Sequence, residues 1–298
     1  MTWKRIATAV VLIPGVVALI LKGSTAIVAL ALAVVILLAL FEFFALGDAI
    51  GHRAYKYWTA ACALAIVYVQ WSQVVLRRPL PGEGAVYSGP ILLLLPSRYL
   101  ASVEDVFFIF LIGVAAITLY TRRPLVEALP AAGISSSGLL FVALPVSYAI
   151  PIHAIRIPGL WSIGPWLLLF ALVITWVGDT AAYFVGRAIG RHKLAPHLSP
   201  NKTWEGSVAS MAGALLLGWF LATRINVPMP IVLGLAAVGN VAGQVGDLLE
   251  SSFKRSAGVK DSGSILPGHG GMLDRIDALI LAIPVVWYYW IWFCSPRM

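Results

Sequence analysis

The stretch that decides both the fold and the chemistry is 251–277, SSFKRSAGVKDSGSILPGHGGMLDRID, a long polar segment in a mostly apolar chain. Its charged residues and histidine are Lys254, Arg255, Lys260, Asp261, His269, Asp274, Arg275 and Asp277, and its glycines are Gly258, Gly263, Gly268, Gly270 and Gly271. Lysine and arginine neutralise phosphoryl oxygens, glycine-rich backbone lets amide N–H groups approach them, and carboxylates can hold a divalent cation. The segment therefore predicts a site for a phosphorylated ligand and a metal ion.

The composition around this segment is that of a membrane protein. Of 298 residues, 60% are hydrophobic and 11% charged, whereas about a quarter of the residues of a soluble domain are charged. The net charge of +8 could indicate nucleic acid, but the basic residues lie in short loops between apolar runs, where retention on the cytoplasmic side explains them better. We therefore expect membrane lipids as partners and no nucleic acid. Cys62 and Cys294 form neither a disulfide framework nor a zinc site.

Apolar runs of span length predict an all-α fold, a polytopic integral membrane helix bundle with about nine transmembrane helices. The predicted spans are 6–21, 24–46, 57–76, 103–120, 130–150, 163–186, 207–223, 228–248 and 276–294. The basic start before 6–21 is similar to a signal peptide, but a second apolar run follows at once, so we expect an uncleaved span. The fifth span is diluted by GISSSG at 133–138. The apolar run within 85–95 is too short to span and would be re-entrant or interfacial.

The basic residues also predict the orientation. With the N-terminus inside, fourteen lysines and arginines fall on that side of the membrane and seven on the other. This excess predicts a cytoplasmic N-terminus and a cytoplasmic loop at 249–275, with access to nucleoside triphosphates. We accordingly divide the chain into anchoring and packing helices at 1–127 and a catalytic region at 128–298, with cytoplasmic loops at 187–206 and 249–275.

Polar residues are also patterned in the sixth predicted span and in the loop after it. Asp179, Tyr183 and Arg187 follow one another at steps of four on one helix face. They contribute either to a ligand site or to an internal network that packs the bundle. In the loop, Lys202 is a candidate ligand for a phosphate, whereas Thr203 could also simply cap the next helix.

The eighth and ninth predicted spans carry acids on defined faces. Asn240, Gln244, Asp247 and Ser251 form a polar stripe that, in lipid, must face protein, water or a ligand. Gly239 and Gly243 nearby would let another helix approach closely. Asp247 is best interpreted as a metal ligand or an ion-pathway residue. Asp274 and Asp277, three residues apart at the start of the last span, are metal candidates too, although acids at a helix N-terminus are also favoured by its dipole.

The polar segment resembles the signature of the phosphatidate cytidylyltransferase family, also called CDP-diacylglycerol synthases. The matching residues are Ser251, Lys254, Arg255, Lys260, Asp261, Gly263, Leu266, Pro267, His269, Gly270, Gly271, Asp274, Arg275 and Asp277. A solvated loop that only set topology would need neither HGG nor acids at fixed spacing. Upstream, SPNKTWEG at 199–206 is similar to the family's SPKKTWEG, with Asn201 where a lysine is common. The resemblance covers about 163–277 and is only generic before that.

The resemblance implies that phosphatidate attacks the α-phosphorus of CTP, giving CDP-diacylglycerol and pyrophosphate. It implies Mg²⁺ held by Asp247, Asp274 and Asp277, and leaves open whether a monovalent cation such as K⁺ joins it. The implied catalytic residues are Asp247, Asp274, Lys254, Arg255 and Lys260. The implied substrate-binding residues are Ser251, Lys202, Thr203, Asp261, His269, Gly270, Gly271, Arg275, Asp179 and Tyr183. A homodimer in the bacterial inner membrane, with its active site facing the cytoplasm, is expected on the same basis.

Two other functions remain open from the residues. A CTP-dependent polyprenol kinase would transfer the γ-phosphoryl group to an alcohol and would need a base such as His269. An ion-coupled transporter would also place acids inside the membrane, but transporters commonly contain two similar halves. The polar residues of this chain are concentrated in one half, which favours an enzyme.

Overall fold

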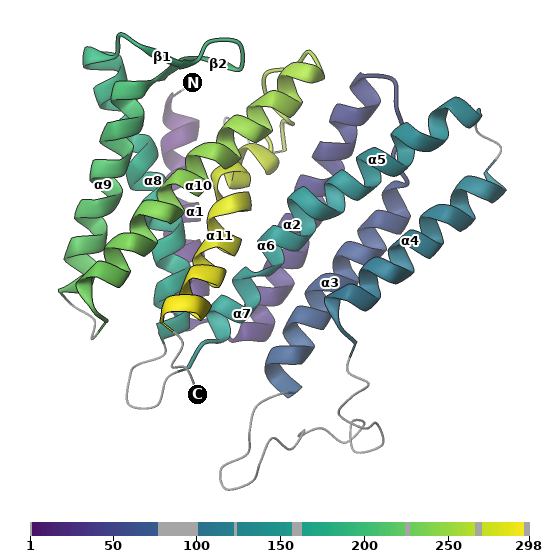
Figure 1. Cartoon of the computed structure of the whole chain (residues 1–298), viewed down its shortest axis with the longest axis horizontal. Helices are drawn as coiled ribbons and strands as arrows, with labels where there is room; N and C mark the ends of the chain where they lie inside the picture. Colours follow the sequence, from purple (N-terminus) through teal and green to yellow (C-terminus); the bar gives the residue numbers. More distant parts are fainter. Residues whose placement is uncertain are drawn as a thin grey trace, which may run out of the picture. The chain divides into compact units, whose positions relative to one another are not determined.

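The computed structural model describes residues 2–76, 101–121, 124–156, 163–223, 227–265 and 270–294. These residues are almost entirely helical, which confirms the all-α prediction (Figure 1). Eight helices in the described part of the chain are long and apolar enough to cross a membrane. The first predicted span is not among these eight: it corresponds to α1 (Thr2–Lys22), in which Leu12–Lys22 forms a shorter apolar helix. The apolar run within 85–95 lies outside the described residues.

The chain divides into two compact units, Ala18–Gly164 and a second unit made of Met1–Val17 with Pro165–Met298. The first unit contains α2 (Thr25–Ala49), α3 (Lys56–Leu76), α4 (Val103–Tyr120) and the interrupted span Leu125–Ala154. The second contains α8 (Ile163–Ile189), β1 (Lys193–Ala195), β2 (Ser199–Thr203), α9 (Trp204–Ala222), α10 (Met229–Ser256) and α11 (Leu273–Phe293). These units are defined by packing, so the functional division at 127/128 stays a prediction.

The fifth predicted span is the irregular one. It consists of η3 (Leu125–Glu127), α5 (Ala128–Gly138), a π-helical turn η4 (Leu139–Ala143), α6 (Leu144–Ser147) and α7 (Ala149–Ala154). The turn follows Gly138, where an added Cβ would lie 2.8 Å from a Leu40 methyl carbon. Glycine and serine weaken the helix here, and close packing against α2 compensates.

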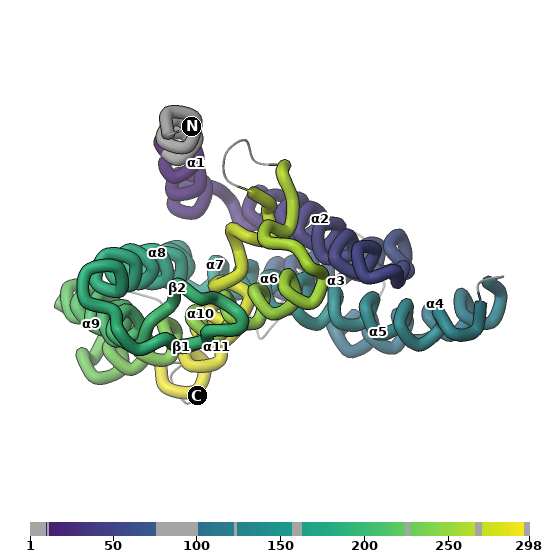
Figure 2. The backbone as a smooth tube through the Cα atoms, turned by 90° about the horizontal axis from the view of Figure 1, so that it is seen from above, coloured from purple at the N-terminus to yellow at the C-terminus, as the bar shows by residue number. Residues whose placement is uncertain are grey.

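Close packing of α10 against α11 positions the polar residues of the second unit. At Gly246 of α10, a Cβ would lie only 2.6 Å from the carbonyl oxygen of Asp277. A Cβ at Gly239 would meet Ile174 of α8 at 2.6 Å. The close approach at Gly239 was predicted from the spacing of Gly239 and Gly243, whereas the approach at Gly246 was not. The start of α11 therefore lies directly beside the C-terminal half of α10 (Figures 1 and 2).

Among the boundaries that differ from the predicted ones, two lie beside the polar residues of α10 and α11. Helix α10 continues to Ser256, although its span was predicted to end at 248, and α11 begins at Leu273 rather than at 276. The extension contains Glu250 and Lys254, an i,i+4 acid–base pair that favours helix. Lys254 is therefore fixed on a helix and not carried by the loop predicted at 249–275.

The loop predicted at 187–206 contains a short antiparallel hairpin that the sequence did not indicate. Lys193 lies opposite Thr203 and Ala195 opposite Ser199, so β2 leads directly into α9. Thr203 caps that helix by accepting a hydrogen bond from Gly206 N–H at 3.1 Å. The Arg255 side chain donates to the Leu198 carbonyl oxygen at 3.2 Å, which ties the hairpin to the end of α10.

Candidate active site

The polar stripe of α10 faces α9 rather than lipid. Asn240 Nδ2 donates to Ser210 Oγ at 2.9 Å, and Gln244 Nε2 donates to Asn240 Oδ1 at 2.7 Å. Ser207 donates in turn to the Gln244 side-chain oxygen. Asn240 and Gln244 thus belong to a hydrogen-bonded network between α10 and α9. This network explains both polar side chains without a ligand.

The stripe ends in an ion pair with the hairpin. Lys202 Nζ lies 2.5 Å from Asp247 Oδ2, and both side chains are about a quarter exposed, at 26% each. Ser251 Oγ lies 3.5 Å from the other carboxylate oxygen, Asp247 Oδ1. Position 202 precedes the α9 cap at Thr203, so the hairpin and the helix start together determine where the lysine is placed. The structure therefore brings together three residues predicted to act at one site.

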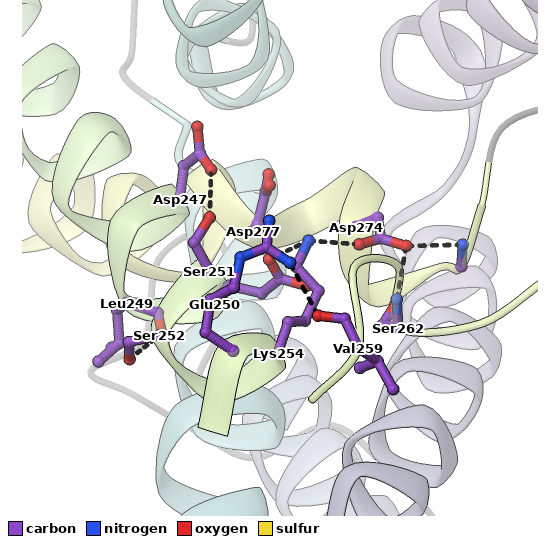
Figure 3. Close-up of polar contacts among 12 residues, drawn as sticks. Asp247, Leu249, Glu250, Ser251, Ser252, Lys254, Val259, Ser262, Asp274 and Asp277 are labelled. Carbon is purple, nitrogen blue, oxygen red and sulfur yellow. Dashed lines mark hydrogen bonds and ion pairs between the residues drawn. The ribbon is translucent and has the colours of Figure 1, made fainter. Parts of the chain in front are cut away.

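A second and more deeply buried cluster lies between α10 and the start of α11 (Figure 3). Lys254 Nζ donates to Asp274 Oδ1 at 2.6 Å and lies 2.6 Å from Glu250 Oε2. The side chains of Lys254, Asp274 and Glu250 are only 11%, 7% and 2% exposed. Burying charges costs several kcal/mol per ion, and mutual attraction offsets this only with good geometry. Such burial is characteristic of a site in which charge must be held in place.

Asp274 also organises the glycine-rich loop that precedes it. Its Oδ2 atom accepts hydrogen bonds from the backbone N–H groups of Ser262, at 3.0 Å, and Gly271, at 2.9 Å. Gly270 adopts a positive φ of 77°, and a Cβ there would lie 2.9 Å from Asp274 Oδ2. Glycine is required here for both reasons. The acid, the loop amides and Lys254 thus form one connected unit.

Three further acids interact electrostatically across the helices. Asp277 is repelled by Asp247, Glu250 and Asp179, and Asp179 is attracted by Lys202. Among the described residues, no group of three or more His, Cys, Asp or Glu side chains converges as a complete metal cage. Mg²⁺ does not need one, because it is usually bound by one or two carboxylates together with water and substrate phosphates. The repelling carboxylates of Asp247 and Asp277 fit that requirement.

Several predicted residues have contacts that are not specific to a ligand. Arg255 Nη1 donates to the Val259 carbonyl oxygen at 2.8 Å and so braces the loop. Arg187 Nη1 donates to Tyr183 Oη at 2.9 Å on the surface of α8, while Asp179 on the same helix is exposed. Thr203 is buried as the cap of α9. Their roles toward substrate stay predictions.

The remaining predicted residues are exposed or lie outside the described part of the chain. Lys260, Asp261 and Arg275 are exposed. His269 lies outside the described residues, so its assignment to substrate binding is not tested. Glu250 is a central member of the buried cluster that we did not select from the sequence. Its position four residues before Lys254 was the available signal.

Comparison with known proteins now gives the family. The sequence profile of the Cytidylyltransferase family matches residues 3–293. The chain belongs to the cytidylyltransferase family. A phosphatidate cytidylyltransferase from Brucella suis is 34% identical over 256 residues, covering 83% of this chain and 88% of the relative.

Two other relatives match a shorter part of this cytidylyltransferase. The phosphatidate cytidylyltransferase of Haemophilus influenzae is 44% identical over 135 residues, covering 43% of this chain and 46% of the relative. That of Staphylococcus aureus is 46% identical over 121 residues, covering 40% and 46%. The resemblance seen in the polar segment is confirmed.

Proposed function

We propose that this protein is a phosphatidate cytidylyltransferase, which converts CTP and phosphatidate into CDP-diacylglycerol and pyrophosphate in phospholipid biosynthesis. The observation that carries the proposal is the buried Lys254–Asp274 pair with its two loop N–H donors, within the segment that resembles the family signature. It lies in the half of the chain where ion-paired lysines and acids gather between α10, α11 and the hairpin. Family membership and the named relatives support the same reaction.

The reaction requires two highly charged anions to meet in line. A phosphate oxygen of phosphatidate forms a bond to the α-phosphorus of CTP, and the bond from that phosphorus to the β-bridging oxygen breaks to release pyrophosphate. The nucleophile is already anionic, so charge neutralisation and positioning matter more than proton removal. Lysines held by carboxylates, as Lys202 and Lys254 are, suit this task.

The residues divide by position. Lys202 and Lys254 would neutralise phosphates, and the backbone around Gly270 and Gly271 would lie against the nucleotide or the leaving pyrophosphate. Lys260 and Arg275, both exposed, would contact phosphates from the loop side. Ser251 and Asp261 are also assigned to substrate binding. The acyl chains of phosphatidate would stay in the bilayer.

Asp247, Asp274 and Asp277 would hold Mg²⁺, which when bound would screen charge on the triphosphate. Both oxygens of Asp274 are engaged by Lys254, Ser262 and Gly271, so metal binding there would require Lys254 to shift its contact. A monovalent cation such as K⁺ remains a candidate as a second ion.

The chain is an integral membrane protein by its apolar helices. We further propose that it resides in the bacterial inner membrane with the site facing the cytoplasm, because the basic residues favour that orientation. A homodimer is proposed from the family resemblance.

Product analysis tests the proposed reaction. The purified protein in detergent–lipid micelles, given CTP, Mg²⁺ and phosphatidate, is expected to form CDP-diacylglycerol and pyrophosphate in equal amounts, as measured by mass spectrometry and a phosphate-release assay. Replacing phosphatidate by diacylglycerol removes the attacking phosphate and should abolish both products. Phosphorylation of a polyprenol with release of CDP would instead identify a kinase and contradict the proposal.

A further inference from the structure

Glu250 is a buried acid for which the proposed chemistry has no use. Its side chain is 2% exposed, and its Oε2 atom lies 2.6 Å from Lys254 Nζ, one turn further along α10. A buried carboxylate is expensive to keep ionised unless a cation is close. An acid at this position therefore needs an explanation beyond filling space.

Lys254 lies between two carboxylates, those of Glu250 and Asp274 (Figure 3). Its ammonium group donates a hydrogen bond to Asp274 Oδ1 at 2.6 Å. Glu250 Oε2 lies at the same distance from the ammonium group, 2.6 Å, so both acids pair with Lys254. Asp274 Oδ2 is meanwhile fixed by two backbone N–H groups. Oδ1 is thus the Asp274 atom held by a side chain that can move.

We propose that Glu250 is the second counter-ion of Lys254 and keeps the ammonium group in place when Asp274 Oδ1 turns to a divalent cation. The inference rests on the proposed function, which assigns a cation to Asp274. Without Glu250, freeing Asp274 would leave a buried ammonium group with no carboxylate beside it, which is strongly unfavourable. Glu250 is therefore a positioning residue that acts through Lys254 and raises the affinity of the site for the cation.

A purely structural role predicts something different. As one half of an i,i+4 pair, Glu250 could simply stabilise the last turns of α10, worth a few tenths of a kcal/mol. Its removal would then lower the unfolding temperature and leave cation affinity unchanged. Cation affinity is the readout that separates the two roles.

The test measures Mn²⁺ binding to the purified full chain by electron paramagnetic resonance, with Mn²⁺ alone and with CTP. Glu250→Gln keeps the size of the side chain and removes its charge, and we expect the dissociation constant for Mn²⁺ to rise about tenfold, as for other residues that orient metal ligands. Glu250→Asp keeps the charge and should bind within about threefold of wild type. The matched control is Glu127→Gln, which removes an acid that pairs with His52 at 3.3 Å in the first unit and should change nothing.

A second background shows whether the effect passes through Lys254. In Lys254→Met there is no ammonium group to retain, so adding Glu250→Gln should weaken Mn²⁺ binding less than about threefold, a non-additivity expected only of coupled residues. Equal Mn²⁺ affinity of wild type and Glu250→Gln would overturn the inference, as would a full tenfold loss in the Lys254→Met background.

Failure of the proposed function would look different. If Asp274→Asn binds Mn²⁺ as wild type does, the cation does not reach Asp274, and both the metal assignment and the inference about Glu250 are overturned. If Asp274→Asn loses Mn²⁺ binding but Glu250→Gln does not, only the inference about Glu250 falls.

Discussion

The Lys56–Asp48 pair of the first unit and the Lys254–Asp274 pair of the second differ in burial and in what they connect. In the first unit, Lys56 pairs with Asp48 where α2 leads into α3, and these side chains are 30% and 37% exposed. In the second unit, Lys254 and Asp274 pair at 11% and 7% exposure and join α10 to α11. An exposed pair adds about 0–1 kcal/mol to stability, whereas a buried pair often adds no net stability at all. Burial of the second pair is therefore explained by chemistry better than by folding.

The acids of the two pairs give the largest expected contrast. Asp274→Asn removes the carboxylate that holds Lys254 and the loop, and we expect kcat/KM for CTP to fall about a thousandfold, as for other losses of a preorganised charge. Asp48→Asn changes the exposed pair and should leave kcat/KM within about twofold. Steady-state kinetics of both variants in one micelle preparation makes the comparison. Equal losses of kcat/KM in Asp274→Asn and Asp48→Asn would contradict the expected difference between the two pairs.

The lysines sharpen the contrast. Lys202→Met leaves Asp247 without its cation and removes a proposed phosphate ligand, so we expect kcat/KM to fall about a hundredfold. Lys56→Met is the matched change in the first unit and should alter activity by less than about threefold. Retention of full activity by Lys202→Met would exclude Lys202 from the site.

Two glycines with positive φ allow a finer test. Gly270, at φ 77°, has Asp274 Oδ2 within 2.9 Å of an added Cβ, whereas Gly51, at φ 87°, has nothing within 4 Å. Each change to alanine should lower unfolding stability by about 1–2 kcal/mol through backbone strain. Only Gly270→Ala should also lower kcat, by about tenfold, because the Asp274 carboxylate must shift. Thermal unfolding together with initial rates tests both expectations, and a normal kcat for Gly270→Ala would contradict them.

The smallest expected effect concerns the helix caps. Thr203 caps α9 and Ser24 caps α2, and each side chain accepts a backbone N–H bond. Replacement of either by alanine should cost about 1 kcal/mol of unfolding stability. Because the Thr203 hydroxyl is committed to this bond, we expect the KM for CTP to change less than about threefold in Thr203→Ala. A larger rise would instead support the predicted contact of Thr203 with substrate.

The sequence predicted the helical membrane fold well, because long apolar runs without charges allow few other structures. It also predicted the pairing of α10 with another helix, since small residues at Gly239 and Gly243 mark a close approach. The hairpin at 193–203 was missed because its short strands lack alternating apolar residues. The end of α10 was missed because polarity suggested a loop where an acid–base pair continued the helix.

The sequence predicted which residues form the site better than it predicted which of them contact one another. Residue types and spacing selected Lys254 and Asp274, but their direct pairing depends on the backbone approach at Gly246, which sequence spacing does not show. Glu250 was passed over because the sequence placed it in the loop predicted at 249–275, where an acid is ordinary. Only its burial beside Lys254 distinguishes it.

The most direct test of the account follows two labels of CTP in wild type and in Asp274→Asn, with Asp48→Asn as the control. We predict that α-labelled CTP transfers its label to the lipid phase only with Mg²⁺ and phosphatidate, that γ-label leaves in pyrophosphate, and that Asp274→Asn abolishes the transfer while Asp48→Asn does not. Transfer of the γ-label to lipid, or undiminished α-label transfer in Asp274→Asn, would contradict the assignment of the chemistry to the buried cluster between α10 and α11.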